Sequence, residues 1–426
     1  MKLLITLFVV YIVSPAYPSD LVRRVENLEA ERVLNIFSFN GEFRTQYFKI
    51  KNPRGEMLDL YRLNSFLGVN ANISPKIKFY SRYVMSKYFN LYTEENRRPI
   101  NDDLALGSRY DGTNVKVERA YFDYFFDVPL VLTVGRLPTF GGEPLNYYDG
   151  LPAQSTYPIM AYSVEMDGVA LTYDFYNILP RNHQFSLRAI YTPFSHLNYN
   201  SGFFPLSIPT GMDGGKATSE MVGTLAAEYL LKNRRYFLDE WGFKFFYTKL
   251  DGVTFEDVIL PPLPQAGIAN PTPLLQFPDK MFDLELTSFS GQLLNVGKMG
   301  LDIHASLTYS KVVNHKLASL AGGATLGLRS NTVGEVSAKS MLITLKQKLP
   351  FPSLRNPSFG LEYFKGERNF VTPTVFGNYE DVTGFYSTMG SAWHVFSLWP
   401  IENQLSLRLG YRHQHSDYKV NRINLF

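Results

Sequence analysis

Short stretches that alternate apolar and polar residues recur from about Phe37 to Phe426. The segment 60–73 is the clearest example, because its odd positions carry Leu63, Leu67, Val69, Ala71 and Ile73, whereas its even positions are mostly Arg, Asn and Gly. Successive side chains of a β-strand point to opposite faces. The segment therefore predicts a strand with one apolar and one polar surface.

The connections between the predicted strands are alternately short and long. Other strands are predicted near 37–49, 114–127, 130–137 and 418–426. Long connections lie near 90–113, 138–162, 195–217, 251–280, 313–332 and 367–381, and shorter ones near 177–183, 232–240, 293–299, 350–357 and 399–403. Short periplasmic turns and longer extracellular loops are typical of outer-membrane barrels. We predict an all-β fold over 36–426, a transmembrane antiparallel β-barrel of about sixteen strands, with a range of roughly 14–18.

The N-terminus predicts export. Lys2 precedes the apolar run Leu3–Val13, and Ser14-Pro15-Ala16 provides small residues for cleavage, so residues 1–16 are interpreted as a signal peptide. About eleven apolar residues are too few to span a bilayer. Leu21, Val25 and Leu28 have helical spacing among charged residues, which predicts a short periplasmic helical segment within 17–35. The predicted location is the outer membrane of a Gram-negative bacterium.

Composition agrees with this interpretation. Aromatic residues make up 15% of the 426 residues, including 33 Phe and 28 Tyr, as expected for interfacial aromatic girdles in contact with outer-membrane lipid. The net charge of +3 is too small to argue for a nucleic-acid partner. Because the chain contains no Cys, disulfides and thiolate metal sites are excluded.

The polar parity of the strands supplies candidate pore-lining residues. These are Glu42, Arg44, Arg62, Lys78, Arg82, Arg188, Lys244, Asp283, Glu285, Asp302, Lys346, Glu362, Arg408 and Arg412. Positive charge is concentrated on the early strands and at Arg408 and Arg412, whereas the segment 281–302 is acidic. Facing walls of opposite sign would orient polar solutes. In the alternative interpretation, these charges pair across strands and fill a plugged interior.

The 138–162 connection is the best candidate for a constriction that folds into the pore. Its candidate residues, with one from the preceding strand, are Arg136, Phe140, Glu143, Tyr147, Tyr148 and Asp149. An ordinary surface loop is the alternative. The 251–280 connection is apolar and rich in Pro, and exposed apolar surface of this kind indicates contact with another surface.

Part of the chain resembles a known family. The segments that carry the resemblance are Arg119–Asp123, Leu132–Thr139, Gly142–Pro144 and Asp167–Tyr173. They resemble an uncharacterised family of porin-type proteins of bacterial outer membranes, and Val134-Gly135-Arg136 is more distantly similar to phosphate-selective porins. The resemblance is specific over about 115–176. It implies a porin-type barrel without an established substrate, and the basic ladder of the phosphate porins is not evident here.

The sequence offers little for catalysis or metal binding. His413 and His415 share one strand face, but no third ligand has suggestive spacing, so neither a metal nor a cofactor is predicted. We interpret the chain as an outer-membrane porin, a passive diffusion channel for small hydrophilic solutes or ions, with a homotrimer as one expectation. One alternative is a surface or structural barrel with a blocked lumen and partner-binding loops. A remote alternative is an outer-membrane enzyme.

Overall fold

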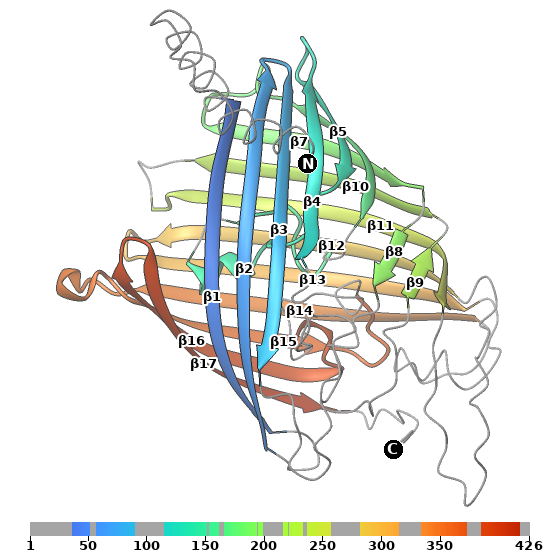
Figure 1. The fold of residues 1–426 in the computed structure, drawn as a ribbon. Helices are drawn as coiled ribbons and strands as arrows, with labels where there is room; N and C mark the ends of the chain where they lie inside the picture. Colours follow the sequence, from blue (N-terminus) through green and yellow to red (C-terminus); the bar gives the residue numbers. More distant parts are fainter. Residues whose placement is uncertain are drawn as a thin grey trace, which may run out of the picture.

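Figure 1 shows a large sheet that curves around an interior, in a computed structural model. The structure describes residues 36–51, 57–89, 115–150, 153–161, 166–193, 195–198, 216–219, 221–232, 237–256, 282–314, 334–372 and 385–417. The predictions for 1–16, 17–35 and 418–426 lie outside these residues, as does most of the Pro-rich 251–280 connection.

Fifteen antiparallel strands form the main sheet. They are β1 (Phe37–Lys51), β2 (Met57–Ser74), β3 (Ile77–Phe89), β4 (Val115–Phe125), β5 (Leu130–Arg136), β6 (Asp167–Asp174), β7 (His183–Thr192), β10 (Met221–Lys232), β11 (Glu240–Glu256), β12 (Phe282–Val296), β13 (Leu301–Asn314), β14 (Gly334–Lys348), β15 (Ser358–Gly366), β16 (Gly390–Glu402) and β17 (Leu405–Ser416). The predicted all-β antiparallel fold is confirmed, and the described strands form one curved sheet that is not closed.

Each strand pairs with the next along the chain, and β7 pairs with β10. The short strands β8 (Ser195–Asn198) and β9 (Lys216–Ser219) pair with each other, and β9 also pairs with the end of β11. This pairing holds β11 extended as far as Glu256, into a region that the sequence predicts to be a loop.

The sheet has two edges among the described residues, β1 and β17. Each is hydrogen-bonded to one neighbour there. Because fourteen antiparallel steps separate them, β1 and β17 run in the same direction, and antiparallel closure requires one further strand between them. The sequence predicts that strand over 418–426.

The alternation of connections follows the prediction. The β2–β3, β4–β5, β6–β7, β10–β11, β12–β13, β14–β15 and β16–β17 connections are short and lie at one end of the sheet, called here the turn end. The opposite, loop end carries the long connections, together with the short β1–β2 connection.

Helices are few and short in the described ranges. They are α3 (Leu145–Asp149) and the 3-10 turns η2 (Pro352–Leu354) and η4 (Phe385–Ser387). None of the helices in that part of the chain is long and apolar enough to cross a membrane.

Candidate functional site

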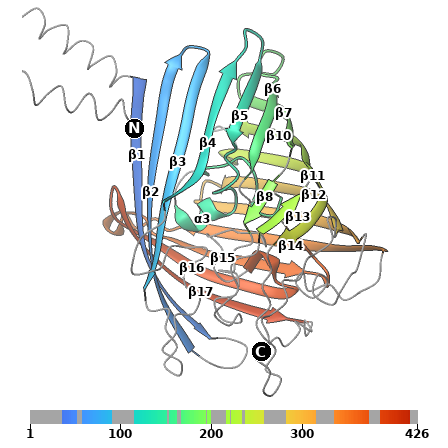
Figure 2. The same cartoon turned by 45° about the vertical axis from the view of Figure 1, so that its right-hand side comes forward.

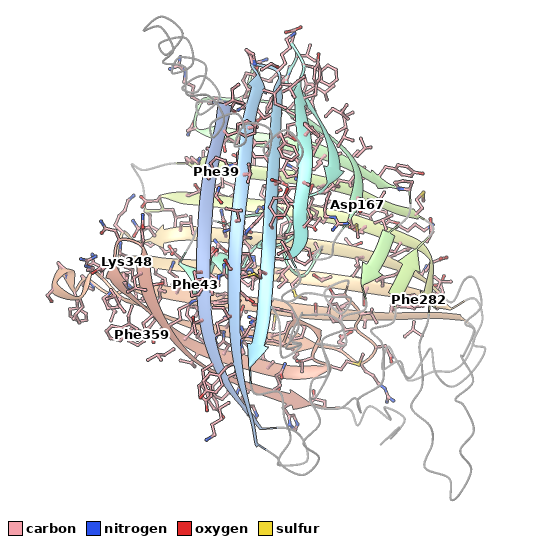
Figure 3. All side chains as sticks on the ribbon, viewed as in Figure 1. Phe39, Phe43, Asp167, Phe282, Lys348 and Phe359 are labelled. Carbon is pink, nitrogen blue, oxygen red and sulfur yellow. The ribbon has the colours of Figure 1, made fainter. Side chains whose placement is uncertain are left out.

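The two faces of the sheet have the reverse polarity of a soluble protein. Phe39 and Phe43 on β1 project outward, with 66% and 68% of their surfaces exposed (Figure 3). Leu307 on β13 and Leu409 on β17 are similarly exposed. Many polar side chains face the inside, beside apolar ones that the interior chain covers. The polar ones include Arg62, Asn64, Thr248, Ser288, Ser306, Thr344 and Glu362. An apolar outer face around a polar inner face is what a lipid-embedded barrel requires.

Aromatic side chains gather on the outer face near the turn end. Tyr229 stacks on Phe243 with ring centroids 5.2 Å apart, and Trp241 lies 5.3 Å from Tyr229. Farther round the sheet, Phe359 and Trp399 form an edge-to-face pair at 5.7 Å. Such rings are typical of the girdle at a membrane interface, where their amphipathic character suits the headgroup region.

Near the loop end, charged residues occupy the outer face of β11 to β14. Lys249, Glu285 and Lys311 are direct neighbours across three strands. Lys249 pairs with Asp251 at 2.7 Å, and Lys311 pairs with Glu335 at 2.8 Å. Because charges on the lipid side are costly within hydrocarbon, this part of the wall is suited to the headgroup region or water.

This arrangement corrects the prediction that Asp283 and Glu285 line the interior. The even-numbered neighbours Phe282, Leu284 and Leu286 point inward and are buried in an apolar cluster with Leu137 and Tyr157. Asp283 and Glu285 therefore face outward. Asp283 also accepts a hydrogen bond of 2.7 Å from the Gly252 backbone N–H.

The described part of the chain between β5 and β6 lies inside the curved sheet. We call residues 137–166 the constricting segment, of which 137–150, 153–161 and 166 are described. Its helix α3 lies against β14 and β16 in the interior of the curved sheet (Figure 2). Phe140, Leu145, Tyr147, Ile159 and Met160 are almost completely buried.

Apolar contacts hold the constricting segment on several sides. Phe140 packs with Phe66 and Val84 of β2 and β3. On the opposite side, Leu145, Ile159 and Met160 belong to a cluster whose other members are Ala338, Leu342, Phe364, Phe370, Phe385, Tyr386 and Ala392. The segment thus bridges the lumen, in contact with widely separated strands.

Ion pairs add to this attachment. Glu143 accepts a hydrogen bond of 2.9 Å from Lys244 of β11. Asp149 lies 3.1 Å from Arg44 of β1 and also pairs with Arg408 of β17. Asp149 consequently connects the two edge strands of the described sheet through a single carboxylate.

Arginine side chains of the wall also donate hydrogen bonds to the constricting segment. Arg119 donates to the carbonyl oxygens of Gln154 at 2.6 Å and of Phe140 at 3.3 Å. Arg188 donates to the Thr156 hydroxyl at 2.7 Å and to Glu228 at 3.3 Å. The side chain of Glu118 is fully buried and contacts Arg119 and Arg82.

The predicted basic wall on the early strands is largely neutralised. Arg82 pairs with Glu42 at 3.2 Å and with Glu118 at 3.1 Å, and Arg44 also contacts Glu42. With Asp283 and Glu285 on the outer face, the two walls do not have the opposite signs that the sequence predicts. The described interior carries ion pairs on both sides instead.

The remaining predicted residues are placed as follows. Arg62 donates two hydrogen bonds to Gln46, of 2.9 and 2.6 Å, and Lys78 lies over the Phe125 ring. Lys346 is 3.5 Å from Asp302 on the neighbouring strand. Arg412 lies over the rings of Tyr148 and Phe385. Arg136 pairs with Asp167 at 2.8 Å at the end of β5. It shares the outer face of the sheet with the exposed Val134 and Val169, which corrects the prediction that Arg136 belongs to a constriction.

Glu362 belongs to a buried network. It accepts hydrogen bonds from the Tyr386 hydroxyl at 2.9 Å and from Thr344 at 3.4 Å, and lies 3.2 Å from Nδ1 of His394. Tyr147 differs, because its buried hydroxyl has no partner, and burial raises the pKa of the phenol. In the described part of the chain, no three His, Asp or Glu side chains gather as a metal site.

Sequence reasoning missed Glu118, Arg119, His304 and His394. Glu118 and Arg119 are adjacent in sequence, and both are buried because the β3–β4 ladder shifts register between Arg82 and Tyr83. Strict alternation assigns adjacent residues to opposite faces, so it cannot identify such a pair. His304 lies among Ala, Ser and Ile in β13. The sequence around it gives no signal, because the residue that lies over it, Tyr147, is distant in the chain.

The chain is similar to several known proteins. Residues 59–185 match a family described as a protein of unknown function (DUF3373), which encloses the region of the sequence resemblance. OprB of Pseudomonas putida is 13% identical, with 90% of each chain covered and a TM-score of 0.45. OmpF of Salmonella typhi is 8% identical, with 90% and 92% covered and a TM-score of 0.44.

A third similar structure is an anion-selective porin from Comamonas acidovorans. It is 8% identical, with 89% of each chain covered and a TM-score of 0.42. No curated protein sequence is significantly similar to the chain.

Proposed function

We propose that this chain is an outer-membrane channel for passive diffusion of small hydrophilic solutes, narrowed by the constricting segment. The observation that carries the proposal is the inverted sheet, in which apolar side chains face outward and paired charges and hydroxyls face inward. About sixteen strands enclose more volume than wall side chains alone can fill. The constricting segment occupies part of that space and determines which solutes pass.

Ionic anchors support this role for the segment. The Asp149 carboxylate binds arginines from both edge strands, and Glu143 binds Lys244 on a distant part of the wall. A loop that is held at several points narrows the pore at rest, as size selection requires. Because interior charges are mostly paired, we expect weak discrimination between cations and anions.

Conductance in a planar bilayer tests the proposal. Purified full-length protein is expected to give stepwise currents in KCl, with a reversal potential close to zero in a salt gradient. Protein that folds and inserts but gives no current would favour a barrel with a blocked lumen. That alternative is supported by the close packing of Leu145, Met160 and Tyr147 against the wall.

Removing the central part of the constricting segment is expected to widen the pore. In the test variant, residues 141–155 are replaced by a short Gly-Ser linker, which eliminates α3 and both acidic anchors. Single-channel conductance should increase at least about two-fold, because conductance depends on pore radius at its narrowest point. The Gly-Ser replacement of the β14–β15 turn, 350–356, is a matched control that leaves the lumen intact. Equal conductance in both variants and the parent would contradict the proposed constriction.

A further inference from the structure

A group of inward-facing side chains on β12, β13 and β14 lacks hydrogen-bond partners. The atoms are Oγ of Ser290, Ser306 and Ser340 and both ring nitrogens of His304, and all are buried. We call these four residues the hydroxyl patch. Ser290 is directly opposite Ser306, while Ser340 is opposite Thr308, two residues farther along β13. The four side chains therefore share one small area of wall.

Neighbouring hydroxyls on the same wall are satisfied. Ser288 and Thr308 hydrogen-bond to each other at 2.9 Å, and Ser310 accepts a bond from the Val371 backbone N–H at 3.3 Å. Buried polar groups in proteins nearly always have partners, because an unpaired group loses its bonds to water without compensation. The hydroxyl patch is therefore an exception confined to a few residues.

The constricting segment lies over His304 and beside Ser340 without satisfying either. Leu145 and Met160 pack with Ala338 and Leu342, the inward-facing neighbours of Ser340 on β14. The Tyr147 ring lies 5.8 Å from the His304 ring, centroid to centroid, and the Tyr147 hydroxyl itself has no partner. Glu143 approaches His304 no closer than 3.8 Å, beyond hydrogen-bond distance. Displacement of the segment would expose six side chains with unpartnered polar atoms to new partners, four on the wall and two on the segment, Asn146 and Tyr147.

The chemistry of the patch identifies the class of partner. Serine hydroxyls and imidazole both donate and accept hydrogen bonds, and none of the four side chains is a carboxylate, ammonium or guanidinium. The nearest charged groups pair with each other, Lys244 with Glu143 and Lys346 with Asp302. A polyol hydroxyl likewise both donates and accepts, whereas an anion would find both of these described lysines already paired.

We propose that the hydroxyl patch is a binding site for an uncharged, polyhydroxylated solute, and that displacement of the constricting segment exposes it. This inference rests on the proposed channel function and specifies its solute class. The solute replaces the constricting segment as the partner of Ser290, His304, Ser306 and Ser340 while it crosses the lumen.

Current blockade by sorbitol tests the proposal on the full-length protein. Potassium gluconate is the matched solute, because it has the same six-carbon chain but carries a carboxylate. Sorbitol is expected to reduce the KCl current in a saturable manner, whereas gluconate at equal concentration produces only the small, linear effect of viscosity. Equal effects of the two solutes would overturn the proposed specificity.

A triple variant, S290A/S306A/S340A, tests the residues. Its half-saturating sorbitol concentration should rise at least about ten-fold, because three neutral hydrogen bonds are lost. Its heat resistance should equal or exceed that of the parent, since alanine removes unpartnered buried hydroxyls. The control T287A/S337A removes outward-facing hydroxyls from β12 and β14 and should leave sorbitol blockade unchanged.

The outcomes separate the two proposals. If no KCl current is observed, the channel function fails. If current is present but the triple variant retains the sorbitol affinity of the parent, the channel function stands and the hydroxyl patch is not the binding site. The 141–155 replacement gives an independent check, because uncovering the patch should lower the half-saturating sorbitol concentration.

Discussion

The substitution Asp149→Asn is expected to destabilise the protein by roughly 1.5–3 kcal/mol, since it removes the charged acceptor that Arg44 and Arg408 share, while Arg44 keeps its contact with Glu42. Only 8% of the Asp149 side chain and 11% of the Arg44 side chain are exposed, so water screens this pair weakly. The second partner, Arg408, belongs to the opposite edge strand. Loss of the carboxylate therefore weakens both the attachment of the constricting segment to the wall and the link that this segment makes between β1 and β17.

The measurement is the temperature at which the folded, fast-migrating band on a denaturing gel converts to the unfolded band. Asp149→Asn should convert at a lower temperature than the parent. Asp127→Asn is the control, because it removes an ion pair that is shorter than Asp149–Arg44, Lys76–Asp127 at 2.7 Å, from an exposed turn. If both variants convert at the parent temperature, the ion pairs of Asp149 with Arg44 and Arg408 do not stabilise the fold.

The substitution Leu307→Arg is expected to impair membrane assembly. Leu307 lies in the middle of β13 on the outer face, with 57% of its surface exposed. An arginine facing lipid at the bilayer midplane costs roughly 2–4 kcal/mol in a β-barrel. We expect a large decrease in the folded fraction that is recovered in lipid vesicles.

Leu307→Ala serves as the control, since it removes the side chain without adding charge. Alanine is tolerated against lipid, so this variant should assemble almost as well as the parent. If arginine at position 307 folded as well as alanine, Leu307 would face water, and the membrane assignment of the outer face would be wrong.

The sequence was informative where a single physical rule operates along a strand. Alternation identified the strands, and the lengths of the connections identified the turn end and the loop end, because both properties are local. The same rule placed Arg44, Arg82, Arg188, Lys244, Lys346, Glu362 and Arg408 on the inner face, where the structure has them. Their role in permeation stays a prediction.

The rule failed at Asp283 and Glu285, for a reason that concerns the whole fold. Alternation shows which residues of a strand share a face, but it does not show which face points inward. The prediction assigned the polar face to the interior because it assumed that apolar residues contact lipid. At the loop end, the constricting segment supplies Leu137 and Tyr157 as an apolar interior, so Leu284 and Leu286 turn inward. The charged residues then face outward, at a level suited to headgroups or water.

The sequence by itself determined the antiparallel all-β architecture and the alternation of polarity along each strand, because backbone geometry fixes a period of two. The tertiary structure alone decided which charges pair and which hydroxyls remain unsatisfied. Those properties depend on contacts between residues distant in the chain, such as Asp149 with Arg408 and Tyr147 with His304. Contacts such as these arise only because the described part of the constricting segment lies within the curved sheet, and no local pattern encodes the partners its residues find there.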